Sequence, residues 1–387
     1  MSDRSPMHQQ IDTLPQLLRD ITGPFDASAR ATFDFELCHS VKRIYLVGCG
    51  DSYHAPVGAE LAFHKLTGVP TQAASALTFG RYMAAFLPPT GPQTNLVIAV
   101  SVSGVVSRTI EALRLARQAG AVAVALTGAP NAPLAQSAEK VFQTTVPPLP
   151  DELAGMVVPG VRSYLASQMA LYSAAIRMGE VRGHLTTAGA DALRGELLGL
   201  ADVMEATIRA CEPLARDLMQ RWDDIPEFVY VGAGPLYGVA MFSAAKMLEA
   251  SGDPAMAQET EEWAHLQYFG RRADTPTVLI SAADYDADRM AEVARAAQSI
   301  GRRLVGVLPE GETAIGQYVA HVLPVKGAVR ECFAPLVYSI PGELLAAERA
   351  AAIGADYFQR FGGGRTVDWA DGASRIRDSH LLDTVRK

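Results

Sequence analysis

Cysteine is scarce in this sequence, and no group of metal-binding residues stands out. The four cysteines, Cys38, Cys49, Cys211 and Cys332, are far apart, form no Cys-x-x-Cys pair and make no cluster with histidines. This spacing argues against a disulfide framework and against a structural zinc site. We therefore expect a fold that depends on neither kind of cross-link.

Long runs of basic or apolar residues are also missing. The net charge is −8 at pH 7 and there is no long Lys/Arg run, so neither nucleic acid nor an anionic membrane is expected as the main partner. Residues 1–6 lack the apolar core of a signal peptide, and no apolar stretch reaches membrane-spanning length. The sequence therefore predicts a cytoplasmic protein that binds neither a membrane nor nucleic acid.

A duplicated pattern is the most informative feature of the chain. Gly-x-Gly-x-x-Tyr occurs at 48–53 and again at 232–237, which is an offset of 184 residues (232 − 48). Each copy precedes an alanine-rich, predicted helix that ends at Gly68 or Gly252. The 387 residues, 49% of them apolar, can form two cores of ordinary domain size. The duplication predicts two similar α/β domains, and clefts between such domains are common ligand sites.

Uniformly apolar runs alternate with helical stretches in both halves. Because a half-exposed strand would alternate polar and apolar residues, these runs favour mostly parallel, doubly wound sheets covered by helices on both faces. The predicted strands are 43–47, 95–100, 121–126, 227–231, 277–281 and 304–307, with a run at 141–150 closing the first sheet. We expect a helical lead-in at 1–40, a first domain at 41–163, a helical connector at 164–222, a second domain at 223–361 and a tail closing the site at 362–387.

The loop 101–109, Ser-Val-Ser-Gly-Val-Val-Ser-Arg-Thr, follows a predicted buried strand and opens a predicted helix. Backbone N–H groups at a helix N-terminus favour an anion, and the hydroxyls of Ser101, Ser103 and Ser107 add donors. The loop lacks the Gly-Lys-Ser/Thr ending of a nucleotide-binding P-loop. These serines can equally serve as ordinary cap and turn residues. The loop is therefore a candidate anion site and a weak candidate for nucleotide.

The turn that contains Ser52 strengthens the anion interpretation. It follows the predicted strand 43–47, and the loop at 101–109 follows 95–100. Both should thus lie at the carboxyl ends of neighbouring strands, where α/β sheets bind ligands. The turn at 48–53 lacks the third glycine of a dinucleotide fingerprint.

Lys246, Glu249 and His265 form the second candidate site. Lys246 and Glu249 are three residues apart on the predicted helix 240–251, so they share one face, and His265 follows Glu249 by sixteen residues (265 − 249). From spacing alone, an exposed ion pair and a hydrogen-bonded histidine beside Trp263 explain the same residues. The spacing leaves both interpretations open.

Together these motifs resemble the sugar isomerase (SIS) domain. The resemblance depends on 48–55 (Gly-Cys-Gly-Asp-Ser-Tyr-His-Ala), Ser101-x-Ser-Gly and Leu126-Thr-Gly followed by Pro133-Leu-Ala. The duplication resembles the tandem arrangement in the isomerase half of glucosamine-6-phosphate synthase and in related sugar-phosphate deaminases and deglycases. The resemblance covers residues 40–370.

The resemblance implies roles for the first-domain residues. In that family serine-rich loops hold the substrate phosphate, and the matching residues are Ser52, Ser101, Ser103 and Ser107. Valines replace polar residues of the family pattern Ser-Gln-Ser-Gly-Glu-Thr/Ser at three positions, Val102, Val105 and Val106. A different anionic group such as sulfonate, or an unphosphorylated sugar, therefore stays open.

For the second domain the resemblance implies that Glu249 moves a proton between C1 and C2 of an open-chain sugar. A carboxylate suits this task because it can take a proton from one carbon and return it to the next. His265 would assist ring opening, and Lys246 would hold the sugar or tune the glutamate. Glu262 is a reserve candidate for the base.

The family's Schiff-base lysine has its best match in Arg365, which stays protonated and cannot do that chemistry but remains a substrate-binding candidate. The chain starts Met-Ser without an upstream glutaminase domain, so we expect no glutaminase activity.

The resulting hypothesis is a sugar isomerase with a sugar-phosphate or aminosugar-phosphate substrate. The alternatives are an aminosugar-phosphate deaminase, a fructosamine-6-phosphate-type deglycase and a non-catalytic sugar-phosphate sensor. A sensor of this family carries a DNA-binding helix-turn-helix, for which residues 1–40 are too short and not basic enough. The resemblance implies a homodimer in which the histidine reaches the neighbouring subunit's site, and no metal or organic cofactor.

Overall fold

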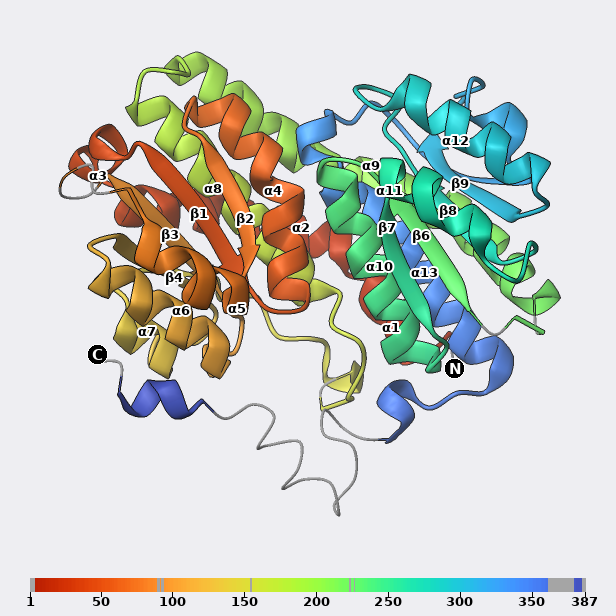
Figure 1. Cartoon of the computed structure of the whole chain (residues 1–387), viewed down its shortest axis with the longest axis horizontal. Helices are drawn as coiled ribbons and strands as arrows, with labels where there is room; N and C mark the ends of the chain where they lie inside the picture. Colours follow the sequence, from red (N-terminus) through yellow and green to blue (C-terminus); the bar gives the residue numbers. More distant parts are fainter. Residues whose placement is uncertain are drawn as a thin grey trace. The chain divides into compact units, whose positions relative to one another are not determined.

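The computed structural model describes residues 4–88, 91, 94–153, 155–222, 224–225, 227–360 and 379–384. Within these residues the chain forms two five-stranded sheets, red to orange and green to blue in Figure 1, each flanked by helices. The first contains β1 (Arg43–Gly48), β2 (Thr71–Ser75), β3 (Asn95–Val100), β4 (Val122–Thr127) and β5 (Lys140–Gln143). The second contains β6 (Phe228–Gly232), β7 (Ala255–Glu259), β8 (Pro276–Ile280), β9 (Arg303–Pro309) and β10 (His321–Val325). The predicted α/β fold is confirmed.

Both sheets have the same strand order. The first runs β2-β1-β3-β4-β5, and the second, read from its other end, runs β7-β6-β8-β9-β10. Every pairing between neighbouring strands is parallel. In this doubly wound order the direction of winding reverses between β1 and β3, and between β6 and β8. Ligands of such sheets bind beyond the carboxyl ends of the strands at this reversal.

The long helices are α2 (Leu14–Thr32), α4 (Asp51–Thr67), α6 (Ser107–Gln118), α8 (Arg162–Val181), α9 (Thr187–Arg221), α10 (Pro235–Ser251), α12 (Ala287–Ser299) and α13 (Pro335–Ile353). Shorter ones are α1 (Pro6–Asp12), α3 (Phe35–Ser40), α5 (Ala76–Thr78), α7 (Pro133–Ser137) and α11 (Thr260–Leu266). Single turns include η1 (Phe79–Met83), η2 (Ala84–Phe86), η4 (Gln267–Phe269) and η9 (His380–Asp383). No described helix is both long and apolar enough to cross a membrane.

The chain divides into two compact units, each with one sheet. The first-sheet unit contains Gln16–Pro147, Ser163–Leu198 and the carboxyl-terminal turn η9. The second-sheet unit contains α1, Pro148–Arg162 and the chain from Gly199 through α13. The helical stretch predicted as a connector is therefore divided between the two units. Helix α8 and the start of α9 belong to the first-sheet unit, and the rest of α9 belongs to the second-sheet unit.

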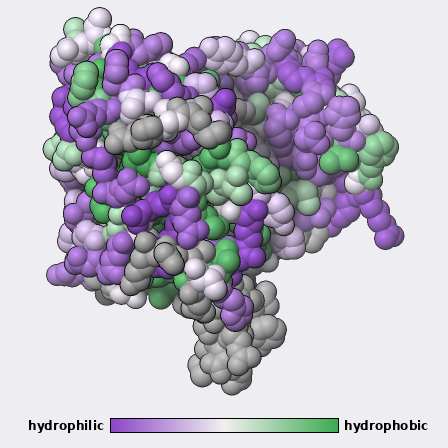
Figure 2. Space-filling model, turned by 60° about the vertical axis from the view of Figure 1, so that its left-hand side comes forward, coloured by the Kyte–Doolittle hydropathy of each residue, from purple (hydrophilic) through white to green (hydrophobic). Residues whose placement is uncertain are grey.

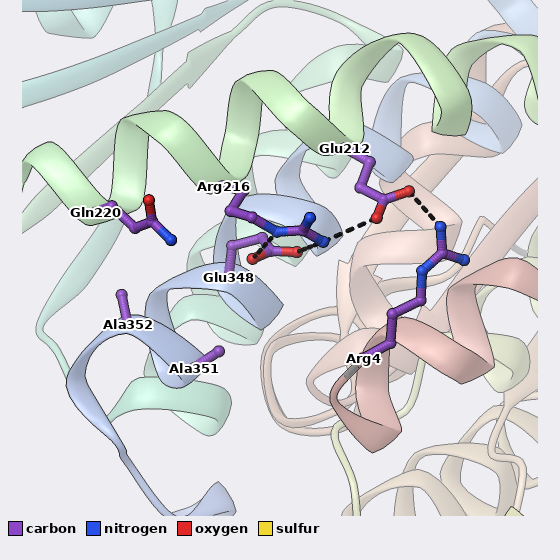
Figure 3. A pocket seen from close by; sticks show the side chains of 7 residues that line it. All are labelled: Arg4, Glu212, Arg216, Gln220, Glu348, Ala351 and Ala352. Atoms are coloured by element: carbon purple, nitrogen blue, oxygen red, sulfur yellow. Dashed lines mark hydrogen bonds and ion pairs between the residues drawn. The ribbon is translucent and has the colours of Figure 1, made fainter. Parts of the chain in front are cut away.

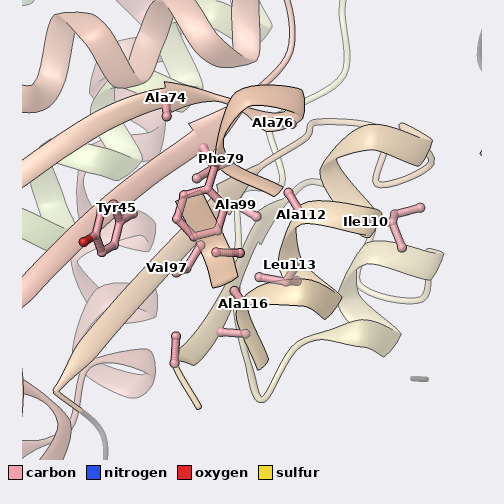
Figure 4. Packing of buried hydrophobic residues seen from close by; sticks show 14 of the residues in the cluster. Tyr45, Ala74, Ala76, Phe79, Val97, Ala99, Ile110, Ala112, Leu113 and Ala116 are labelled. Atoms are coloured by element: carbon pink, nitrogen blue, oxygen red, sulfur yellow. The ribbon is translucent and has the colours of Figure 1, made fainter. Parts of the chain in front are cut away.

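One apolar core lies between the first sheet and the helices after β2 and β3 (Figure 4). Tyr45 and Val97 face it from the strands, Phe79 from η1 and Leu113 from α6. Alanines fill many of the remaining positions, and their small side chains let α6 approach the sheet closely. This packing fixes the amino end of α6 beside the ends of β1 and β3.

The glycine pattern at 48–53 exists because the turn after the strand leaves no room for a side chain. A Cβ on Gly48 would lie 1.8 Å from the backbone oxygen of Ser52, and one on Gly232 would lie 2.5 Å from that of Leu236. Gly50 also has a positive φ of 56°, which an L side chain rarely adopts. The duplicated pattern thus encodes the same strand-turn-helix geometry twice.

Candidate active site

A cavity of about 280 Å³ lies at the reversal point of the first sheet. The turn after β1, the loop after β3 and the first turns of α8 form its wall. Its lining residues are Cys49, Asp51, Ser52, Ser101, Val102, Ser103, Val106, Ser163, Tyr164 and Ser167. Three of the four serines predicted to bind an anion, Ser52, Ser101 and Ser103, therefore line one cavity. Ser107 begins α6 and is not among the lining residues.

The wall of this cavity offers hydrogen-bond donors. Ser101 is 1% exposed, and its hydroxyl has no hydrogen-bond partner within the described parts of the chain. The helices α4 and α6 begin at this wall with N-caps Gly50 and Val106, neither of which makes a side-chain capping bond in the described structure. Uncapped N–H groups at helix N-termini attract anions. The cavity is thus suited to a small anionic group.

Two features of the wall weaken its attraction for a doubly charged anion. Val102 and Val106 line the cavity, so apolar methyl groups form part of its wall. Asp51 also lines it, with one carboxylate oxygen 3.6 Å from Nδ1 of His54. A carboxylate beside an anion is repulsive unless a positive partner offsets it.

Three lining residues on α8 were not predicted from the sequence. Ser163 and Ser167 are one helical turn apart, so both face the cavity, and the buried Tyr164 lies between them in the sequence. The first domain was expected to end at 163 and a helical connector to follow at 164–222, so α8 was not expected in the wall of this cavity. The thiol of Cys49, also in the wall, has its pKa raised by burial and is therefore protonated at neutral pH.

The corresponding loop of the second sheet is filled by its own carboxylate. Ser281 follows β8 as Ser101 follows β3, and Asp286 precedes α12 as Val106 precedes α6; both pairs are offset by 180 residues (281 − 101, 286 − 106). The Ser281 hydroxyl donates to Asp286 Oδ1 at 2.7 Å and accepts from the N–H of Ala283 at 2.9 Å. Burial raises the pKa of Asp286. Of the two equivalent loops, only the first is therefore open to an anionic ligand.

Lys246 and Glu249 are brought together on α10, as predicted. The ammonium group of Lys246 forms an ion pair with Glu249 Oε2 and lies 5.1 Å from the centre of the Phe242 ring. The lysine side chain is 1% exposed and the glutamate side chain 31% exposed. The pair therefore holds a carboxylate in place while leaving part of it accessible to a substrate.

His265 lies on a different helix from this pair. It belongs to α11, which follows β7, whereas Glu249 lies near the end of α10, before β7. His265 is 67% exposed, and its Nε2 lies 3.1 Å from Glu261, whose pKa is lowered mainly by hydrogen bonds from Arg289. This exposed position leaves the His265 ring accessible from outside the second-sheet unit.

The structure gives less information on the other two residues predicted for the site, Glu262 and Arg365. Glu262 is exposed in the first turn of α11, where its N–H donates to the Glu259 side chain at 3.3 Å. Arg365 lies outside the described residues. The described part of the chain contains no cluster of three or more histidine, cysteine or acidic residues suited to a metal ion.

A second cavity, of about 570 Å³, lies among α1, α9 and α13 and is lined by charged residues (Figure 3). Those residues are paired with one another: Arg216 contacts Glu348 at 3.3 Å and Glu212 at 2.8 Å, and Arg4 contacts Glu212 at 2.7 Å. The buried His8 adds a contact of 3.1 Å to Glu348. This network joins α1 to α9 and α13, and the charged side chains that line the cavity are paired with one another.

Comparisons with known proteins agree with this geometry. Residues 37–177 match the family model described as the SIS domain. Glutamine–fructose-6-phosphate aminotransferase (isomerizing) of Gloeobacter violaceus is 30% identical over 353 residues, covering 90% of this chain and 54% of the relative. The same-named protein of Corynebacterium diphtheriae is 26% identical over 364 residues, covering 91% and 56%. The chain thus spans about half the length of the curated relatives it matches.

Solved structures share the fold along almost the whole chain. The C-terminal domain of glucosamine-fructose-6-phosphate aminotransferase from Francisella tularensis aligns with a TM-score of 0.77 at 20% identity, over 92% of this chain and 99% of that domain. Glucosamine-6-phosphate deaminase from Thermotoga maritima aligns with a TM-score of 0.64 at 17% identity, over 90% and 95%. Residues 37–177 therefore match the SIS domain, the chain is homologous to about half the length of these aminotransferases, and it shares the fold of the solved structures.

Proposed function

We propose that the chain is a sugar isomerase that moves a proton between C1 and C2 of an open-chain sugar carrying an anionic group, with a hexose phosphate as the leading substrate class. The observation that supports this most is the cavity of the first sheet, with the buried Ser101 hydroxyl and the starts of α4 and α6 in its wall. A fold likeness alone would not distinguish among the activities of SIS proteins. The names of the relatives, which include fructose 6-phosphate and the word isomerizing, support the same substrate class.

In this proposal the first-sheet cavity binds the anionic group and Glu249 is the base. Glu249 takes the proton from C2 of the aldose while water gives a proton to the carbonyl oxygen at C1, which produces an enediol. The carboxyl group then returns its proton to C1 as the C2 hydroxyl gives its proton back to water and becomes the carbonyl of the ketose. A positioned carboxylate of this kind contributes about 10²- to 10⁴-fold to the rate. The ammonium group of Lys246 keeps Glu249 in position between the two transfers.

His265 is proposed to assist ring opening in the site of a neighbouring subunit. Its exposure supports a role outside its own second-sheet unit. Large apolar residues are exposed in the equivalent segments after both edge strands, Tyr82 and Phe86 after β2, and Tyr268 and Phe269 after β7. Figure 2 shows hydrophobic patches among the hydrophilic residues of one face of the molecule. Such residues are typical of contacts between subunits, so we propose a homodimer.

The deaminase and deglycase alternatives use the same proton transfer and differ in the product. The structural likeness to glucosamine-6-phosphate deaminase keeps the deaminase open as an alternative.

The test is to incubate the chain with hexose, hexosamine and fructosamine 6-phosphates and to analyse the products by proton NMR with an ammonia assay. Interconversion of an aldose and a ketose phosphate supports the isomerase. Release of ammonia without isomerisation would favour the deaminase over the isomerase, and release of an amine would favour the deglycase.

A further inference from the structure

A third cavity, of about 710 Å³, lies in the second-sheet unit at the amino ends of the strands. Its wall includes Glu227 before β6, Pro254 before β7, Thr275 before β8 and Arg302 before β9. These positions are at the opposite end of the sheet from the loop that contains Ser281. The cavity is thus distinct from the reversal point of its own sheet, and it shares no residue with the anion cavity of the first sheet.

Arginines dominate the charge of this wall. Arg271, Arg272 and Arg302 line the cavity, and Glu227 is the one acidic residue among the lining residues. Arg272 is paired with Asp274 at 3.2 Å, whereas the exposed Arg271 side chain makes no hydrogen bond or ion pair among the described residues. In a chain with a net charge of −8, such a local excess of positive charge favours an anionic ligand.

Arg302 is held in a position that leaves one of its guanidinium donors without a hydrogen bond in the described structure. The residue is 8% exposed, and its guanidinium lies 6.0 Å from the centre of the Trp263 ring. One terminal nitrogen donates to the backbone oxygen of Gln267, but Nε has no partner in the described structure. Burial lowers the pKa of this arginine, because a charge removed from water is disfavoured unless an opposite charge compensates it. An anion in the cavity would supply that compensation.

The rest of the wall is apolar. Leu248 at the end of α10 and Met256 on β7 are about half exposed, at 52% and 48%, and Pro254 lies between them in the sequence. Phe228 and Val229 of β6 are buried beneath. This apolar part of the wall can pack against a flat apolar group. A small inorganic ion would leave the same surface exposed to water.

We propose that this cavity is a second ligand site, which binds a small molecule with an anionic group, phosphate or carboxylate, attached to a flat apolar body. Arg271 and Arg302 bind the anionic group through guanidinium hydrogen bonds, which suit both phosphate and carboxylate. The apolar body lies on Leu248 and Met256. The site is independent of the sugar chemistry proposed for Glu249.

Calorimetric titration of the full chain tests this proposal, with phenyl phosphate and benzoate as probes. Inorganic phosphate provides the charge without the apolar body, and benzyl alcohol provides the body without the charge. We expect at least one of the two probes to bind about tenfold more tightly than either control, since both halves of the site contribute. The stronger of the two identifies the preferred anionic group.

Variants assign the binding to this cavity. Arg271→Ala removes an exposed side chain and should fold normally, and Met256→Asp places a negative charge against the probe. Each should weaken binding by about fivefold or more, whereas Arg295→Ala, an exposed arginine of α12 away from the cavity, should leave it unchanged. Ser101→Ala, in the first-sheet cavity, should also leave probe binding unchanged.

If Arg271→Ala and Met256→Asp both bind the probe within twofold of the parent chain, or if Ser101→Ala abolishes binding, the proposal is wrong. A change in sedimentation of Arg271→Ala without a change in binding would instead assign this face to a contact between copies of the chain.

Discussion

Lys246 and Glu249 form an ion pair in which the lysine is buried and the glutamate is partly exposed. This asymmetry determines what each substitution does to stability. Removing Glu249 takes the opposite charge away from a buried ammonium group, whereas removing Lys246 leaves a carboxylate that water can still reach. A buried charge that loses its partner is the costlier of the two.

Glu249→Gln should therefore lower stability by about 2 kcal/mol, a value reduced from that of a fully buried pair because Glu249 is partly exposed. Lys246→Met should cost less, and the double variant Lys246→Met/Glu249→Gln should recover most of the loss of the single glutamine variant. Thermal midpoints from calorimetry measure all three. Additive losses in the double variant would show that the two side chains do not act as a pair.

The two equivalent serines provide a matched comparison at the anion loop. Ser101→Ala removes a hydroxyl without a partner, so we expect no loss of stability but an increase of about five- to tenfold in KM for a sugar phosphate. Ser281→Ala breaks the hydrogen bond to Asp286 and should lower stability while leaving KM unchanged. Equal effects of the two variants on KM would contradict the assignment of the anion site to the first sheet.

The valines of the first-sheet cavity allow a test by gain of function. Val106→Thr replaces a methyl group in the wall with a hydroxyl at nearly the same volume. If the natural substrate carries phosphate, the added donor should lower KM by about threefold to tenfold. Val141→Thr, a substitution on β5 outside the cavity, serves as the control. A higher KM in Val106→Thr would indicate that the wall is shaped for a less polar group.

The proposed sharing of His265 between subunits predicts complementation. Glu249→Gln and His265→Asn variants should each be inactive or nearly so, but a mixture allowed to exchange subunits should recover about a quarter of the parent activity. Half of the dimers would be mixed, and one site in each mixed dimer would have both intact residues. If His265 acts in its own chain, every site keeps one damaged residue and the mixture stays inactive.

The fold could be predicted in those parts where the sequence pattern is strong. The predicted strands 43–47 and 227–231 are apolar and buried after their first residue, and the structure places β1 and β6 inside their sheets, each between two other strands. The edge strands β2 and β7, Thr-Gln-Ala-Ala-Ser and Ala-Met-Ala-Gln-Glu, were missed because they are half exposed and lack β-branched runs. Such strands form because pairing with β1 and β6 compensates for their weak propensity.

The candidate site shows the same division. Ser52, Ser101 and Ser103 could be placed together because each follows a recognisable buried strand, and Lys246 and Glu249 because helical spacing is regular. Ser163 and Ser167 could not, since their position in the cavity depends on how α8 packs against the first sheet. That packing involves residues distant in sequence, and no local pattern encodes it.

The most direct measurement is proton NMR in D₂O of the chain with hexose and hexosamine 6-phosphates, run beside Glu249→Gln. Glu292→Gln, an exposed glutamate of α12, is the matched control. The proposal predicts that deuterium enters at C1 or C2 with the parent chain and with Glu292→Gln, and that Glu249→Gln exchanges at least about a hundredfold more slowly. Exchange at the parent rate in Glu249→Gln would rule out this residue as the base. If no sugar exchanges but one raises the thermal midpoint, the chain binds sugar phosphates as a sensor and does not catalyse their isomerisation.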